Sequence, residues 1–262
     1  MVMGINLDYL EERLRNQPLG WPILYLVRTR STQDVAREAA LAGAREGLLV
    51  LAEEQTAGRG RAGRSWWAPP GTSILSSLLL RPTLPPEHTG YIGMVAGLAM
   101  SDALAEVAGV HVPLKWPNDL LLRGRKLGGI LVESLWEGLR LEAVILGLGL
   151  NVSVRFPPDS PLYGQAISLL EAGIEVAREP IVVAYMSYLA EYYTRLHDGW
   201  VPTTAWAERL ETLGKPVRVI EGSTAWEGRA VDVTPTGELV VQVGSERRVV
   251  RAGDVHIRTI EA

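Results

Sequence analysis

The chain contains no cysteine, so disulfide bonds, thiol nucleophiles and cysteine-ligated metal sites are all excluded. Histidine is also scarce, and the four residues lie far apart with no metal-ligand spacing: His88, His111, His197 and His256. No apolar run approaches the roughly 18–20 residues that a membrane-spanning helix needs. The N-terminal segment is charged and shows no secretory pattern. A cytoplasmic protein that binds no membrane is therefore expected.

Positive charge is carried almost entirely by arginine. Only three of the 26 basic residues are lysines, namely Lys115, Lys126 and Lys215. An ammonium is a compact point charge, whereas a guanidinium is a planar fork, so Lys115 and Lys126 favour sites that require a point charge. A bias in codon use or amino-acid composition is the alternative explanation. Net charge is −4, so no general attraction to nucleic acid is expected.

The segment Gly58–Trp67 has the sequence GRGRAGRSWW. Its glycines allow close approach of the backbone to a ligand, and its arginines suit carboxylate or phosphate groups. The two tryptophans offer flat faces for stacking. We expect a loop that lacks packing partners of its own and becomes ordered over an anionic ligand that carries a ring. The near match of GRGRAGRS to a phosphate-binding P-loop is rejected, because arginine replaces the required lysine and no helix follows.

Periodicity and turn residues divide the chain into two parts. Helices are expected over 6–16, 32–41, 91–107, 165–171, 180–197 and 203–212, and strands over 23–27, 48–52, 73–80, 112–116, 119–122, 128–136 and 140–148. After Gly214 the pattern changes to five short strands separated by turns, which favours a small barrel of the SH3 type. We predict a domain over residues 1–212 and a second over 213–262.

Four strings occur in a fixed order along the chain: EEQTAGRGRAGRSW, KWPNDL, KLGGILVE and GLGLNV. Together they resemble the biotin–protein ligase family, and the resemblance covers about residues 29–262. It implies an α+β fold, in which a central mixed β-sheet is flanked by helices, as in class II aminoacyl-tRNA synthetases, and is followed by the small barrel.

The resemblance also implies the chemistry. Such enzymes form biotinyl-5′-adenylate from biotin and ATP with Mg²⁺, and then pass biotin to one lysine of a carboxyl carrier protein. No protein metal site is expected, because the ATP phosphates hold the Mg²⁺. The first step needs charge neutralisation and in-line placement more than proton transfer.

The implied site residues fall into three groups. The catalytic residues are Lys126, Arg59 and Asp119. The biotin-binding residues are Ser31, Thr32, Gln33, Gln55, Arg59, Gly60, Arg61, Lys126, Gly128, Gly129 and Gly147. The ATP-binding residues are Arg59, Arg61, Arg64, Trp66, Lys115, Asn118, Lys126 and Asn151. Gln33 stands where many family members carry asparagine.

Plainer roles remain open for some of these residues. Lys126 is also explained as a surface charge at the start of a strand, Asp119 as a turn residue after Pro117, and Trp66 as packing for a lid. Tight strand packing is an alternative role for Gly128, Gly129 and Gly147.

Two other functions are considered. A lipoate ligase or octanoyl transferase would share the fold and the acyl chemistry, but the GRGR and KWPND strings favour biotin. A nucleic-acid-binding module would use the arginine loop, but basic density is confined to that loop. Too few residues precede Val27 for a helix-turn-helix, so we expect a monofunctional enzyme without a DNA-binding domain. Family members often dimerise through the central sheet, so a homodimer is expected.

Overall fold

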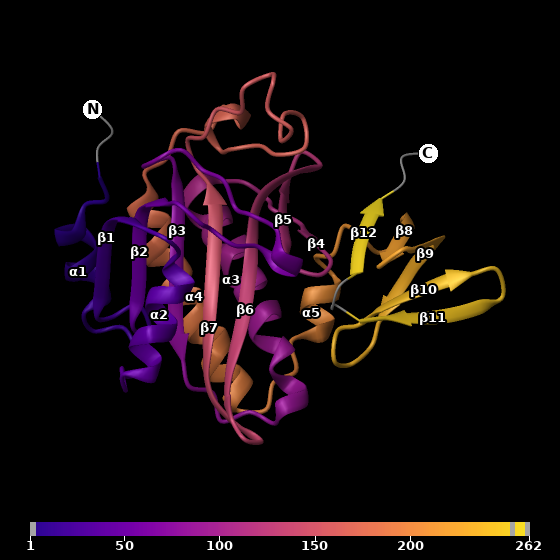
Figure 1. The fold of residues 1–262 in the computed structure, drawn as a ribbon, viewed down its shortest axis with the longest axis horizontal. Helices are drawn as coiled ribbons and strands as arrows, with labels where there is room; N and C mark the ends of the chain where they lie inside the picture. The colour runs from indigo at the N-terminus through magenta and orange to yellow at the C-terminus, as the bar shows by residue number, and fades with distance from the viewer. Residues whose placement is uncertain (1–3, 252–254, 260–262) are drawn as a thin grey trace.

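A seven-stranded mixed sheet forms the centre of the larger part of the protein (Figure 1). The structure is a computed structural model, and it describes residues 4–251 and the backbone of residues 255–259. The strand order is β1-β2-β3-β7-β6-β5-β4, and only β1 and β2 run parallel. The strands are β1 (Ile23–Thr29), β2 (Leu49–Gln55), β3 (Ser73–Leu80), β4 (Leu114–Lys115), β5 (Asp119–Leu122), β6 (Arg125–Glu137) and β7 (Arg140–Asn151).

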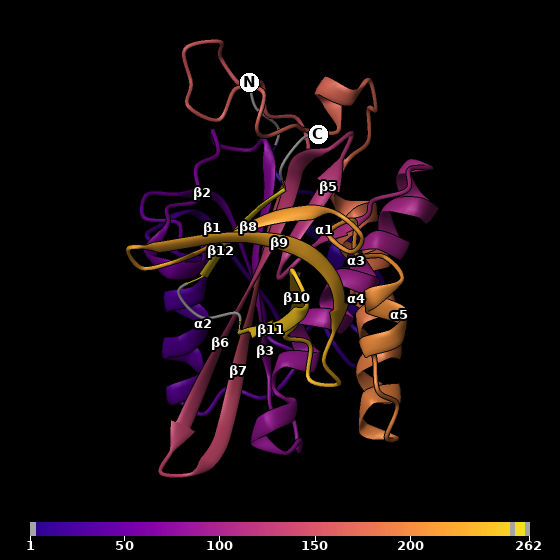
Figure 2. The same cartoon turned by 90° about the vertical axis from the view of Figure 1, so that its right-hand side faces the viewer.

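Helices cover the two faces of this sheet unequally. Figure 2 shows α2 on one side of the sheet and α3 and α4 on the other. The helices are α1 (Leu7–Leu14), α2 (Thr32–Leu41), α3 (Gly90–Ala108), α4 (Arg178–His197) and α5 (Thr203–Ala207), with short 3-10 turns η1 (Arg61–Gly63), η2 (Pro86–His88) and η3 (Leu170–Ala172). The face behind α3 and α4 is therefore thickly covered, while α2 covers only part of the other.

Strand alternation explains this division. Along β3, Ile74, Leu78 and Leu80 pack in the large core with α3 and α4, whereas Leu79 packs in a smaller cluster with Ala36 of α2. Because successive side chains of a strand point to opposite faces, the positions between the core leucines of β3 and β7 face the α2 side. Toward the carboxyl end of β7 they include the small residues Ser73, Ser77, Gly147 and Gly149, so the strands themselves leave this part of the face open.

Helix α3 is the apolar centre of the fold. The stretch Pro86–Ala108 is long and apolar enough, by length and composition, to cross a membrane, and 67% of its apolar window is buried within the protein. The expectation that no apolar run approaches the length of a membrane-spanning helix is therefore wrong for this stretch. Its burial against the sheet and α4 identifies α3 as a core helix.

Two predicted helices are wrong or too long, and both for the same reason. Residues 165–171 form no α-helix, because the backbone of Gln165 and Ile167 bonds to Lys126 of β6. Residues 203–212 are helical only over Thr203–Ala207, because Arg209 and Glu211 bond to Leu114 of β4. In both segments the sheet edge takes the backbone groups that a helix would have paired internally.

A buried ion pair fastens α4 to the sheet. Arg178 lies 2.6 Å from a Glu53 carboxylate oxygen, and both side chains are almost completely buried. Tyr25 and the Ile5 amide also donate to Glu53. Burial by itself raises the pKa of Glu53, but the bonds from Arg178, Ile5 and Tyr25 outweigh it and hold the pKa below the ordinary value.

The smaller part of the protein is a five-stranded antiparallel sheet with the order β11-β10-β9-β8-β12. Its strands are β8 (Pro216–Glu221), β9 (Thr224–Val233), β10 (Leu239–Val243), β11 (Glu246–Val250) and β12 (Val255–Thr259), as the turn spacing predicted. Val217, Val219, Ala230 and Val241 belong to the same apolar core as α3, so the two sheets share one interior. Closure as an SH3-type barrel and the boundary at 212/213 stay predictions.

Candidate functional site

The pairing of strands brings distant motifs into one row on the open face. Leu75 of β3 pairs with Gly149 of β7, Gly149 with Gly129 of β6, Gly129 with Asp119 of β5, and Asp119 with Lys115 of β4. Directly opposed residues of a sheet share a face. Three of the four strings, KWPNDL, KLGGILVE and GLGLNV, therefore meet at one place.

A buried polar cluster lies at the α2 end of this face. The side-chain carbonyl oxygen of Gln55 accepts from the backbone N–H of Thr32 at 2.7 Å and from the Thr32 hydroxyl at 3.0 Å. Ser77 donates to Thr32 or to the Gln33 carbonyl oxygen, each at 2.8 Å. Ser31 is 1% exposed, and its hydroxyl has no partner among residues 4–251. A buried hydroxyl without a partner is costly unless a ligand or water satisfies it, so the cluster is suited to a small polar group.

Three residues that the sequence reading missed complete this cluster. The Ser77 hydroxyl lies within hydrogen-bond distance of both Thr32 and Gln33, and the Glu133 carboxylate accepts from the side-chain amide of Gln33 at 3.1 Å. Asp34 binds Arg59 at 2.6 Å. Strand alternation could have identified Glu133, since it lies four residues from Gly129 on the same strand. No predicted site residue lies on β3, so the sequence held no comparable signal for Ser77.

The arginine loop is folded against the protein. The Gly60 amide donates to the Arg64 carbonyl at 2.7 Å, and the Trp66 amide to the Gly58 carbonyl at 2.9 Å. Arg59 is held by Asp34 and lies 3.5 Å from Glu133. The expectation that this loop lacks packing partners is therefore wrong. Sequence inspection did not reveal these acidic partners, because they come from α2 and β6.

Trp66 lies flat on a floor made by two glycines. A methyl group added to Gly149 would come within 2.5 Å of the indole ring, and one added to Gly129 within 3.5 Å. The Lys126 ammonium lies 5.7 Å from the centre of the same ring. These glycines are needed because any side chain at Gly149 would displace Trp66. The indole N–H is buried and has no partner within the described part of the chain.

The remaining glycines differ in their surroundings. A methyl group on Gly147 would meet the Gln33 side chain at 2.9 Å, on the site face. On Gly128 it would meet Leu120 and Leu150, which both belong to the core. Gly128 thus faces away from the site, and only its backbone can approach a ligand.

Positive charge gathers at the other end of the row. The Lys126 ammonium lies 2.6 Å from Asp119, and the Lys126 backbone is fixed on both sides by Gln165 and Ile167. Burial lowers the pKa of Lys115, and the nearby positive charge of Lys126 lowers it further, while Asp119 opposes the shift. Two of the three lysines of the chain therefore flank one carboxylate.

The two asparagines border this charged end. Asn118 donates to the Ile130 carbonyl at 2.6 Å and lies 3.4 Å from the guanidinium of Arg61. Asn151 is 3% exposed, and its side-chain amide donates to the Ile167 backbone carbonyl. Its side-chain oxygen has no partner within residues 4–251. Arg64 is exposed at the loop. The loop and the KWPND hairpin thus touch through Arg61 and Asn118.

No group of three or more acidic or histidine side chains in the described residues is arranged to hold a metal ion. The nearest carboxylates, Asp34, Asp119 and Glu133, are engaged by Arg59 or Lys126. These residues fit a cation that arrives with most of its oxygen ligands on a phosphorylated substrate.

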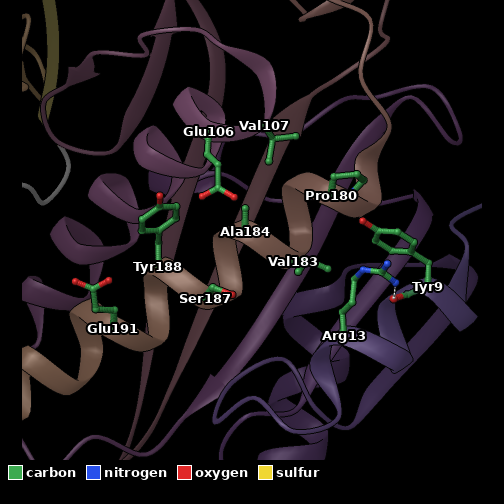
Figure 3. A pocket seen from close by; sticks show the side chains of 10 residues that line it. All are labelled: Tyr9, Arg13, Glu106, Val107, Pro180, Val183, Ala184, Ser187, Tyr188 and Glu191. Carbon is green, nitrogen blue, oxygen red and sulfur yellow. Dashed lines mark hydrogen bonds between the residues drawn. The ribbon is translucent and has the colours of Figure 1, made fainter.

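A separate hollow of about 300 Å³ lies on the opposite side of the sheet, between α1, α3 and α4 (Figure 3). Figure 3 shows Glu106 and Tyr188 on one side of it and Tyr9 and Arg13 on the other. None of the predicted site residues lines it.

Comparison with known proteins agrees with this geometry. Residues 25–151 match the biotin/lipoate A/B protein ligase family, and residues 212–258 match the biotin protein ligase C-terminal domain. The fold resembles that of a biotin protein ligase from Aquifex aeolicus, solved in complex with biotin and ATP. The TM-score is 0.79 at 24% identity, covering 91% of this chain and 99% of that one.

Two curated relatives carry the comparison further. A bifunctional ligase/repressor BirA of Bacillus subtilis is 32% identical, over 93% of this chain and 76% of its own length. A biotin–[acetyl-CoA-carboxylase] ligase of Mycobacterium tuberculosis is 36% identical, over 95% of this chain and 96% of its own length. The similarity to the Mycobacterium enzyme extends over nearly the whole of both proteins, and this chain therefore belongs to the biotin protein ligase family.

Proposed function

We propose that this chain is an ATP-dependent biotin protein ligase. It joins biotin to AMP, releases pyrophosphate, and then transfers the biotinyl group to a lysine of a biotin carboxyl carrier protein. The observation that carries the proposal is the continuous row from the polar cluster around Thr32 and Ser77, across the glycines, to Lys126 and Lys115. One face thereby carries a polar cluster, a floor of glycines and a positively charged end in sequence.

The pocket suits biotin. The ureido ring carries a carbonyl oxygen and two N–H groups, which match the unpartnered Ser31 hydroxyl and the side-chain amides of Gln33 and Gln55. The pentanoate chain would then lie along Gly147, Gly149 and Gly129, and Trp66, whose ring fills the space over Gly149, would move to admit it. Trp66 rests on this floor and would cover the chain or the adenylate.

The first step joins two anions. A carboxylate oxygen of biotin attacks the α-phosphorus of ATP, a P–O bond forms, and the bond to pyrophosphate breaks. No proton moves, so the protein must offset charge and align the two groups. Lys126 extends from the charged end of the floor, and Arg59 and Arg61 approach from the loop. A compact ammonium at Lys126 can sit between two oxyanions where a planar fork cannot.

The second step needs a neutral amine. The carrier lysine attacks the carbonyl carbon of biotinyl-AMP, a C–N bond forms, and AMP leaves. The amine must lose a proton, and Asp119 is the carboxylate of the row that can orient the ammonium or accept the proton. The relative from Mycobacterium is named for acetyl-CoA carboxylase, which supports the carrier domain of such a carboxylase as acceptor.

The proposal extends to Mg²⁺, bound mainly through the phosphates of ATP, where it would offset their charge. We further propose that the enzyme works in the cytoplasm without binding duplex DNA or membranes, in keeping with its net charge of −4. A homodimer is proposed as well. Val27 on the edge strand β1 is 72% exposed, and an apolar edge strand favours association with a second copy.

Label transfer tests the function. The purified chain is incubated with ATP, Mg²⁺ and a carrier domain, with either biotin or lipoate. We expect avidin-detectable label on one carrier lysine with biotin and no acylation with lipoate. Acylation with lipoate alone would assign the protein to the other branch of the fold. Absence of transfer from either would refute the proposal.

A further inference from the structure

The KWPND string forms a tight hairpin between β4 and β5. Leu114 pairs with Leu120 and Lys115 with Asp119. Lys115 and Asp119 thus project on the site face, whereas Trp116 is 2% exposed and packs in the core. One buried residue therefore anchors a turn whose neighbours are charged site residues.

Both N–H groups of Trp116 donate to residues outside its own sheet. Its backbone N–H donates to the Thr212 hydroxyl at 2.9 Å, and its indole N–H donates to the Gly237 carbonyl at 2.9 Å. Thr212 precedes the smaller sheet, and Gly237 lies in the turn between β9 and β10. The second, smaller sheet thus reaches into the core of the first at this residue.

The β9–β10 turn is itself seated firmly. The Pro235 carbonyl accepts from the Thr203 hydroxyl at 2.6 Å and from the Tyr91 hydroxyl at 3.2 Å. Gly237 has a φ of +93°, and a methyl group there would lie 2.1 Å from the end of the Met94 side chain. Only glycine suits both the conformation and the space, so the turn presents its carbonyl to Trp116 in a defined position.

The hairpin connects the anchored Trp116 directly to residues of the site. Asn118 is fixed to Ile130 of β6 by two hydrogen bonds, at 2.6 and 2.9 Å. The side-chain oxygen of Asn118 lies 3.4 Å from the guanidinium of Arg61 in the arginine loop. The next residue, Asp119, forms an ion pair with Lys126. A shift of Trp116 would therefore move groups on the nucleotide side, while the pocket around Thr32 lies at the other end of the row.

We propose that Trp116 is a positioning residue through which the C-terminal sheet sets the nucleotide side of the active site. This inference rests on the proposed function. The C-terminal sheet acts on the hairpin that carries Lys115, Asn118 and Asp119 through Gly237, and Thr212, in the segment that leads into this sheet, holds the same residue, Trp116.

Threonine 212 offers the sharpest test. Thr212→Val keeps shape and burial but leaves the Trp116 amide without an acceptor, whereas Thr212→Ser keeps the hydroxyl. Trp116→Phe removes the indole donor while preserving an aromatic core residue. Ser101→Ala serves as the control, because it deletes a hydroxyl of similar burial that donates to Val112 at 2.8 Å, outside the hairpin.

The measurements are KM for ATP in biotin-dependent pyrophosphate exchange and Kd for biotin by calorimetry. We expect KM for ATP to rise about tenfold or more in Thr212→Val and Trp116→Phe, as for a displacement of catalytic groups by a fraction of an ångström. Biotin Kd should stay unchanged, and Thr212→Ser and Ser101→Ala should behave as wild type.

Unchanged KM in both test variants, or an equal rise in Ser101→Ala, would overturn the positioning role and leave Trp116 a packing residue. A parallel loss of biotin affinity would do the same, since it would indicate general loosening. Failure of the wild-type chain to exchange pyrophosphate would instead count against the proposed function itself.

Discussion

Replacement of Gly149 by alanine should separate chemistry from folding. A methyl group at this position would lie 2.5, 2.7 and 2.9 Å from three atoms of the Trp66 indole. Carbon atoms pack at about 3.5–4.0 Å, so the ring must move by about 1 Å. The φ of Gly149 is not positive, so alanine is compatible with the strand backbone. The perturbation is therefore a displaced ring rather than a strained chain.

The displaced ring should reduce catalysis far more than stability. A shift of about 1 Å in a positioning group can lower the rate about 100-fold, and we expect a loss of this order in adenylate formation. Because Trp66 belongs to a surface loop that can give way, the melting temperature should fall by only a few degrees. Single-turnover formation of biotinyl-AMP and thermal denaturation measure the two effects.

Gly93 of α3 provides the matched control. A methyl group there would meet Val132 at an ordinary 3.5 Å on the helix side of the sheet. Gly93→Ala should leave the rate unchanged and raise stability by about 0.5–1 kcal/mol, as alanine does within a helix. A Gly149→Ala enzyme with the wild-type rate would refute the position assigned to Trp66 over the glycine floor.

Further predictions concern charge and the polar pocket. Lys126→Ala should lower adenylate formation about 100- to 1000-fold with the fold retained, and Lys126→Arg should restore little of it; near-normal exchange in the arginine variant would contradict the point-charge argument. Glu53→Gln should cost about 3–5 kcal/mol at neutral pH, because it removes the buried carboxylate that Arg178 binds at 2.6 Å. Since the pKa of Glu53 is below the ordinary 4.5, its stabilisation is present above that pH and is lost as the pH falls through the lowered pKa. Urea denaturation between pH 7 and 3 should therefore show a shallower acid dependence in the variant, and equal slopes would argue against the pair. Ser77→Ala should raise the biotin Kd about tenfold in calorimetry by removing the donor to Thr32 and Gln33; an unchanged Kd would place biotin elsewhere.

Much of the fold could be predicted because local pattern and tertiary structure agree. The strands at 73–80 and 119–122 appear with the predicted bounds, and α3 and α4 follow long apolar segments. Prediction failed at 165–171 and 203–212, where helical patterns were overridden by backbone bonds to β6 and β4. Such competition depends on which edge lies nearby, and the pattern within one segment does not contain that information.

The site residues were also predicted only in part. The motif strings identified Lys126, Asp119 and Arg59, and strand register brings the first two within 2.6 Å. Their partners were not predicted, since Asp34 and Glu133 come from other elements and belong to no distinctive string. Gly128 and Gly129 are neighbours in the sequence, yet they face the core and the site respectively. Only the pairing of β5, β6 and β7 determines which of the two faces a ligand.

The most direct test of the central claim is exchange of labelled pyrophosphate into ATP by the purified chain. Exchange reports adenylate formation alone, so it depends on no choice of carrier protein. We predict exchange that requires biotin, is not supported by lipoate, and falls about 100- to 1000-fold in a Lys126→Ala protein that still melts cooperatively. Exchange without added biotin, or the wild-type level of exchange in the Lys126→Ala protein, would contradict the assignment of this face as the site of biotin activation.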